Sequence, residues 1–315
     1  EETTIHATTL RGDFAKAVEL IADIAFRSTF PEREIEREKE VIADEINTYK
    51  DSPAEMLYDT FEDMLFEGSE LGHNILGRKA ALMRYDGAAI RAFTARTHTT
   101  DRMVFSSIGN FSPKTAEATA LRYFGEQAAT TRGFERAAPP AVKPFEKTVT
   151  KYTHQTHCII GNRACGIEET KRLPLALLVN VLGGPSANSL LNVEVREKHG
   201  LSYNIEANYI PYGDSGLVAI YFSSEHANEA QCAELVERQL QRLRTTPLTG
   251  RQLSMAKKQF IAQLAISGES NENYMLSAGK SLLTHDEIDT MEEVYAKIGA
   301  LTAAQLTEAA EEVFT

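Results

Sequence analysis

The clearest periodic pattern lies between Glu32 and Lys50, a stretch that contains neither proline nor glycine. Ile35, Ile42 and Ile46 recur there at helical spacing, which predicts a helix with one buried apolar stripe. The charged residues on its other faces are expected to lie in water: Arg33, Arg37, Lys39, Glu40 and Asp44.

Two acidic residues, Glu38 and Glu45, fall inside this stripe, about two helical turns apart. A carboxylate on an apolar stripe is unfavourable unless a cation or water compensates it. Both residues could pair with a buried Arg or Lys, or lie at the wet edge of the stripe. Alternatively they could bind a metal or act in acid/base chemistry. Periodicity alone leaves these alternatives open.

The remaining pattern predicts short strands and many helices. Strands are expected at 3–10, 102–108, 146–152, 157–162, 201–210 and 217–223. Helices are expected at 13–26, 53–66, 79–83, 86–96, 113–124, 173–182, 187–198, 228–244, 250–267, 271–283 and 302–313. Strands and helices do not alternate as βαβ units, so we expect an α+β fold with antiparallel sheets packed against helices.

Two helix ends have recognisable sequences. Ser52, Pro53 and Glu55 predict a helix start, with Ser52 as N-cap and Glu55 closing a capping box. Gly200 follows a helical pattern and predicts a helix end, because glycine tolerates the left-handed conformation found there.

The two halves of the chain resemble a repeat. Residues 30–35 align with 248–253 at a shift of 218 positions, which places Gln263 opposite Glu45. We predict a first unit at 1–127, a Pro-containing linker at 128–145 and a second homologous unit at 146–315. Aligned in this way, the first unit is expected to lack its N-terminal part and the second its final strand.

Composition limits the possible partners and compartments. The 315 residues suffice for two domains, and the net charge of −12 disfavours nucleic acid or an anionic membrane as a partner. No apolar run approaches the roughly 20 residues of a membrane span. Three cysteines are too few for a disulfide framework, which favours a reducing compartment. We expect the bacterial cytoplasm rather than the periplasm, although the chain shows no targeting signal on which to decide.

Four motifs together resemble the pitrilysin family of zinc peptidases, which includes insulinase-like enzymes and the mitochondrial processing peptidases. They are EIEREKEVIADEI followed by DSP at 34–53, LGHNILG at 71–77, MVFSSIGNF at 103–111 and LLNVEVREKHGLSYNIEA at 190–207. The resemblance implies two tandem units of the pitrilysin/LuxS-like metallohydrolase fold. It is strongest to bacterial members with a single pair of units, which assemble as dimers.

The resemblance also implies roles for particular residues. In this inverzincin family an H-x-x-E-H motif and a more distant glutamate bind zinc. Glu45 matches that glutamate, and Glu38 matches a glutamate that supports the site or assists catalysis. Arg196 and Tyr203 match a pair that contacts the substrate backbone. From spacing alone, they could equally be an arginine at a helix C-terminus and a half-buried strand tyrosine.

The chain departs from the family at its central motif, because none of its eight histidines forms H-x-x-E-H. We expect that motif in a segment preceding Glu1, and we expect residues 1–315 alone to bind zinc weakly and to be inactive. The predicted function is that of a zinc endopeptidase or processing peptidase acting on extended peptides within a clamshell. Its partners would be a peptide or unfolded polypeptide and a second subunit, as a homodimer or as a heterodimer with a related chain. The alternative is a non-catalytic family subunit, scaffold or peptide-binding protein.

Overall fold

The computed structural model describes residues 2–167 and 169–315. Its contacts divide the chain into two compact units, neither of which is continuous in sequence. Unit 1 comprises 1–46, 77–136 and 264–289, and unit 2 comprises 47–76, 137–263 and 290–315. These units are defined by contacts rather than by homology, so the repeat boundaries at 1–127 and 146–315 stay a prediction.

The described part of unit 1 is helical. Its elements are η1 (Arg11–Asp13), α1 (Phe14–Arg27), most of α2 (Glu32–Lys50), α4 (Lys79–Leu82), α5 (Gly87–Thr97), η3 (Thr100–Arg102), α6 (Pro113–Phe124) and α10 (Asn271–His285). Val18 and Ala22 are the buried residues of α1, which packs against α6. The Phe14 and Phe111 rings stack with their centroids 4.3 Å apart, and the Phe26 and Phe124 rings meet edge to face. Aromatic contacts therefore supply much of this small core.

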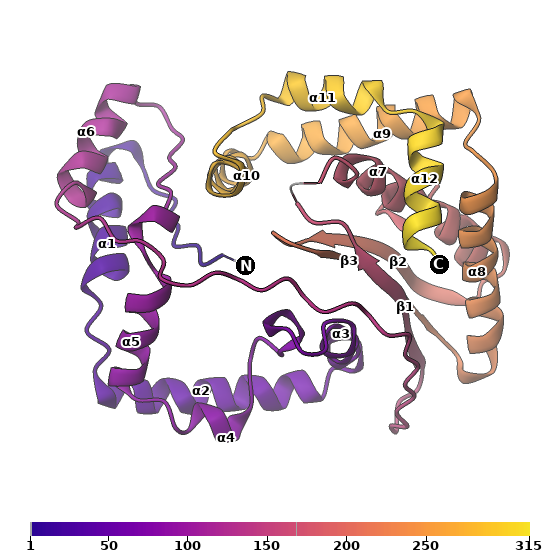
Figure 1. Ribbon diagram of the computed structural model, residues 1–315, viewed down its shortest axis with the longest axis horizontal. Coiled ribbons are helices and arrows are strands. Elements are labelled where there is room, and N and C mark those ends of the chain that lie inside the picture. Colours follow the sequence, from indigo (N-terminus) through magenta and orange to yellow (C-terminus); the bar gives the residue numbers. More distant parts are fainter. Residues whose placement is uncertain (1, 168) are drawn as a thin grey trace. The chain divides into compact units, whose positions relative to one another are not determined.

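Unit 2 is built on a three-stranded antiparallel sheet in the order β1-β3-β2 (Figure 1). Its strands are β1 (Thr156–Ala164), β2 (Ser202–Pro211) and β3 (Gly216–Ser224). Every residue of the central strand β3 is buried, because both faces of the sheet are covered. The larger core packs one face against α7 (Arg172–Gly183), α8 (Glu229–Thr245) and α12 (Ala303–Val313). The smaller core packs the other face against α3 (Pro53–Leu65).

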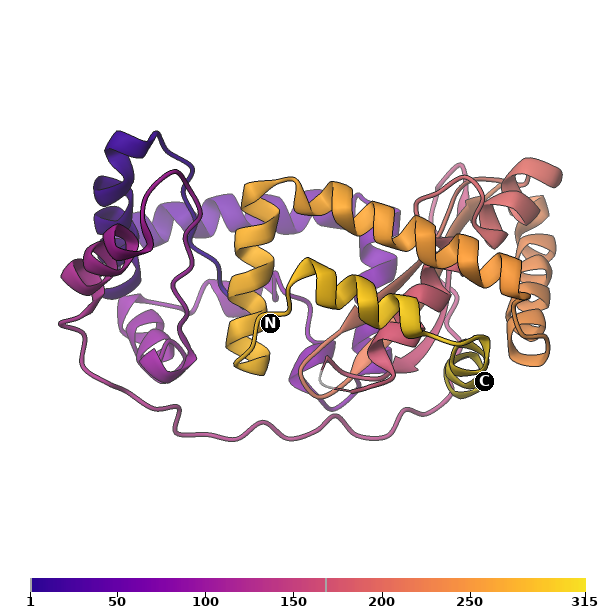
Figure 2. The same cartoon turned by 90° about the horizontal axis from the view of Figure 1, so that it is seen from above.

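The other elements of unit 2 connect these layers. They are η2 (Glu70–Gly72), the π-helical segment η4 (Asn192–Lys198), η5 (His226–Asn228), most of α9 (Gly250–Gly268) and α11 (Met291–Ala300). Residues 128–155 form neither helix nor strand and run as an extended segment (Figure 2). No helix in the described parts of the chain combines the length and apolar character that crossing a membrane requires.

The predicted α+β fold with an antiparallel sheet is confirmed, and three of the six predicted strands are present. The strands predicted at 3–10, 102–108 and 146–152 are wrong, since these described residues are not paired in any ladder. A strand must pair its backbone groups with those of a neighbouring strand. Alternation in the sequence does not show whether such a neighbour exists. Helix α11 was not predicted, although Thr290 and Glu293 form a complete capping box at its start.

The two predicted helix ends are largely as expected. Ser52 is the N-cap residue of α3 and Pro53 its first residue, but the Ser52 side chain makes no cap hydrogen bond, so the predicted capping box is wrong. Gly200 follows η4 with φ +64°, as the predicted helix end requires.

Candidate functional site

Helix α2 buries a face that is rotated from the predicted stripe. Ile35 and Ile46 are buried as predicted, Ile42 is half-buried, and Lys39 and Ala43 complete the buried set. The prediction that Lys39 lies in water is wrong, because only 8% of its side chain is exposed. A lysine can bury its aliphatic stem while its ammonium reaches polar atoms, and hydrophobic periodicity does not register this.

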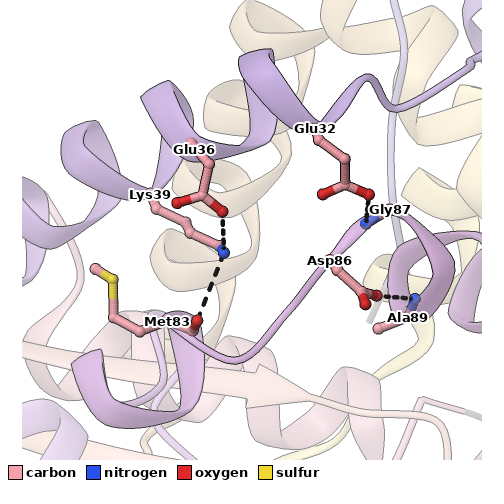
Figure 3. A network of polar contacts seen from close by, with 7 residues as sticks. All are labelled: Glu32, Glu36, Lys39, Met83, Asp86, Gly87 and Ala89. Atoms are coloured by element: carbon pink, nitrogen blue, oxygen red, sulfur yellow. Dashed lines mark hydrogen bonds and ion pairs between the residues drawn. The ribbon is translucent and has the colours of Figure 1, made fainter.

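Polar contacts join α2 to the segment around α4 and α5 in unit 1 (Figure 3). Lys39 Nζ lies 2.6 Å from Glu36 Oε1 and donates to the Met83 carbonyl at 3.5 Å. The Gly87 amide donates to Glu32 Oε1 at 2.9 Å, which satisfies one of the unpaired N–H groups at the start of α5. These bonds fix which face of α2 is buried, and therefore which face remains in water.

Glu38 and Glu45 are both exposed. At about 100° per residue they lie about 100° from the centre of the buried residues and only about 20° from each other. Within residues 2–167 and 169–315, neither carboxylate makes a hydrogen bond or an ion pair. No buried Arg or Lys among the described residues pairs with either acid, and their exposure agrees with the wet-edge alternative.

The described residues do not make a complete zinc site. Among them, no group of three or more His, Cys, Asp or Glu side chains could hold a metal ion. Glu45 could supply one carboxylate ligand, whereas zinc sites in proteins use three or four protein ligands. The residues present therefore do not fit zinc on their own.

Gln263 on α9 is the position that the repeat places opposite Glu45. Its Oε1 accepts a hydrogen bond from Asn180 Nδ2 at 2.8 Å, and its Nε2 donates to Ser186 Oγ at 2.9 Å. An amide can both accept and donate, which a carboxylate cannot do. In unit 2 the residue at this helical position therefore forms neutral hydrogen bonds with α7 and with the loop that follows it.

Arg196 lies in η4, and its side chain is half exposed, with Nε 3.7 Å from Glu197 Oε1. The Gly200 amide donates to the Arg196 carbonyl at 3.0 Å, and the Leu201 amide donates to the Val195 carbonyl at 3.1 Å. These bonds close the π-helical segment and direct the chain into β2. Short π-helical segments often occur at functional sites.

Tyr203 occupies a β-bulge at the start of β2. Ser202 is opposite Ser224 and Asn204 is opposite Ser223, so Tyr203 is the extra residue and has no partner in the ladder. Tyr203 is 86% exposed, so the half-buried strand tyrosine considered from spacing is wrong. Both Arg196 and Tyr203 therefore present donors to solvent in unit 2, although no described contact joins them to each other.

A polar cluster on the sheet face covered by α3 was not predicted. Tyr58 of α3 and Tyr221 of β3 stack with ring centroids 5.8 Å apart, and His157 Nδ1 lies 2.7 Å from the Tyr221 hydroxyl. The Tyr58 hydroxyl donates to Glu206 Oε1 at 3.4 Å and accepts from Asn208 Nδ2 at 3.5 Å. The available signal was on β2, where these polar residues alternate with Ile205, Ala207 and Tyr209.

Comparison with known families agrees with this fold. Residues 1–79 match the family Insulinase (Peptidase family M16), and residues 86–260 match the Peptidase M16 inactive domain. The protein named "Uncharacterized zinc protease YmxG" of Bacillus subtilis is 30% identical over 317 residues, which cover 100% of this chain and 76% of that protein. The chain therefore belongs to the insulinase family of zinc peptidases, M16, as its motifs indicated.

Other relatives and solved structures extend this likeness. An "Uncharacterized zinc protease" of Rickettsia bellii is 26% identical, covering 100% of this chain and 76% of that protein. The structure of a peptidase M16 inactive domain from Pseudomonas fluorescens superposes with a TM-score of 0.88 at 21% identity, covering 96% of this chain and 72% of the other. A protease from Helicobacter pylori gives 0.84 at 18% identity, covering 98% and 76%. These structures share the fold.

Proposed function

We propose that the chain is part of a zinc-dependent endopeptidase that acts on extended peptides. Glu45 would be one zinc ligand, and Glu38 the carboxylate that supports it. Arg196 and Tyr203 would bind the peptide backbone. The histidine ligands and the catalytic base would come from outside residues 1–315, and these residues alone would neither hold zinc tightly nor cleave peptides.

The observation that carries this proposal is the pair of exposed carboxylates on one edge of α2. They lie inside the segment matched to the insulinase family, and no described cation compensates either of them. Carboxylates without partners, facing one direction from a rigid helix, can accept a metal and its supporting hydrogen bonds. The relatives named zinc proteases support zinc as the metal.

Unit 2 offers the features that an extended peptide needs. In the described sheet β2 has a partner only in β3, so its other edge can accept main-chain hydrogen bonds from an added strand. The exposed Arg196 guanidinium and Tyr203 hydroxyl lie at the start of this strand and can donate to peptide carbonyls. We propose a homodimer, or a heterodimer with a related chain, as the assembly, and the bacterial cytoplasm as its location.

A second candidate is a non-catalytic subunit or scaffold that binds peptides. It is favoured by the lack of a three-ligand group among the described residues and by the match of 86–260 to a domain described as inactive. Both candidates use the peptide-binding features of unit 2. They differ in whether Glu45 binds zinc.

The test uses the chain together with the residues that its gene encodes before Glu1. Cleavage of an unstructured peptide and zinc content would be measured for the wild type, for Glu45→Gln and for Glu40→Gln, with and without a chelator. Glu40 is a matched control because it is an exposed glutamate on a different face of α2. We expect Glu45→Gln and the chelator to remove zinc and activity, and Glu40→Gln to retain both. Activity that survives both treatments would refute the ligand assignment, whereas peptide binding without zinc or cleavage would support the scaffold.

A further inference from the structure

The half-buried carboxylate of Glu206 has no positively charged partner among the described residues. Its only hydrogen bond within the described residues comes from the Tyr58 hydroxyl, and it forms no ion pair with a described Lys or Arg. A carboxylate that is partly removed from water is stabilised by a nearby cation. The Glu206 carboxylate, which has no such cation among the described residues, would therefore be stabilised by binding one.

The surroundings of Glu206 are aromatic and show the effect of its charge. Burial raises the pKa of Tyr58 to about 12, and the Glu206 charge contributes to this increase. Burial and then the Glu206 charge also raise the pKa of Tyr221. Burial lowers the pKa of His157, which disfavours the positively charged form of its imidazole. The cluster therefore combines one negative charge with two stacked rings.

We propose that Glu206, with the ring of the half-buried Tyr58, binds the positively charged side chain of an arginine or lysine in the extended peptide. A carboxylate pairs with a guanidinium or ammonium through charge-assisted hydrogen bonds, and a tyrosine ring such as that of Tyr58 attracts the same cations. Thus one position of the peptide would be selected for positive charge.

The position of Glu206 along β2 suits this role. Tyr203 lies three residues earlier, about 10 Å along the strand at 3.3 Å per residue. If the peptide backbone is bound at Tyr203 and runs along β2, the peptide residue about three positions further along would lie beside Glu206. The selectivity therefore rests on the proposed binding of an extended peptide by unit 2.

The test compares two fluorescein-labelled unstructured peptides that differ only by arginine or citrulline at one central position. Citrulline has nearly the same shape as arginine without its charge. We expect fluorescence anisotropy to show about tenfold tighter binding of the arginine peptide to the 315-residue chain, equivalent to 1.4 kcal/mol. Glu206→Gln should abolish this preference while keeping an acceptor oxygen for Tyr58. Glu237→Gln, an exposed glutamate on α8, should retain it.

The outcomes separate this inference from the proposed function. Equal affinity of the wild type for both peptides would refute the inference and leave the proposed function intact, whereas no binding of either peptide would refute both. A preference that persists in Glu206→Gln would refute the assignment to Glu206. If circular dichroism shows that Glu206→Gln is unfolded, Tyr58→Leu provides the second test, because loss of one ring should also reduce the preference. A folded Tyr58→Leu variant with the full preference would contradict the proposal.

Discussion

Replacing Lys39 tests whether its aliphatic stem or its charge holds the buried face of α2. Lys39→Ala removes three methylene groups and the ammonium from a side chain that is 8% exposed. At about 0.8 kcal/mol per buried methylene, the loss of packing should lower the free energy of unfolding of unit 1 by about 2 kcal/mol. A residual cavity would add to this loss.

The charge of Lys39 should contribute less than its stem. Its ion-pair partner Glu36 is 65% exposed, and surface ion pairs contribute about 0–1 kcal/mol. Lys39→Met keeps most of the stem and removes the charge, so we expect a change within about 1 kcal/mol. Glu36→Gln should have a similarly small effect, since it leaves the stem untouched.

Urea unfolding of the three variants, followed by circular dichroism, measures these differences. Hydrogen exchange of the α2 amides assigns them to unit 1, because two units can unfold separately. If Lys39→Met destabilised the protein as much as Lys39→Ala, the bonds to Glu36 and Met83 would dominate, and the argument from buried stem area would be wrong.

Three further predictions follow from the same structure. Gly161→Ala would bring a Cβ within 2.2 Å of the Val218 carbonyl oxygen and 2.7 Å of the Phe61 ring. Thermal unfolding should therefore show that the free energy of unfolding falls by about 1–3 kcal/mol. In the control Gly213→Ala the added Cβ meets nothing within 4 Å, so stability should change little. Gly200→Ala also meets open space but has φ +64°, so it should cost about 1 kcal/mol in the same assay, and a neutral result would contradict the backbone argument. Burial raises the pKa of Cys158 from 9.0 to about 11, so the unfolded chain releases this proton first and stability should fall as pH rises from 9 to 11. Urea midpoints at pH 8 and 10.5 should show a smaller fall for Cys158→Ala, and an equal fall in both proteins would refute this cause.

Residues whose environment is decided by nearby sequence could be predicted. Ile35 and Ile46 are buried as the helical period predicts, because the direction of a side chain on a helix follows from its position along the local sequence. Lys39 was misplaced because the period describes side-chain direction and cannot distinguish a buried stem from a solvated one. The predicted strand at 3–10 failed for a different reason, since its alternation is local while its hydrogen-bond partner must come from elsewhere in the chain.

The candidate site shows the same division. The motif around Glu38 and Glu45 indicated both residues, but whether a cation paired with them depended on the rest of the fold. The exposure of Tyr203 depends on the register between β2 and β3, which no local pattern records. The contact of Tyr58 with Glu206 joins residues separated by 148 positions, so it became visible only in the structure.

The strand order β1-β3-β2 determines when the sheet can form during synthesis. β2 and β3 are joined by four residues, 212–215, and can pair as soon as both have left the ribosome. β1 is made earlier, but its only described partner is β3, so its backbone groups remain unpaired until the hairpin exists. Helix α3, made earlier still, has no sheet to cover before that point. Helices α8 and α12, which cover the other face of the sheet, are made last, so part of the apolar surface of unit 2 stays exposed on the nascent chain until about residue 313 and is vulnerable to aggregation until then.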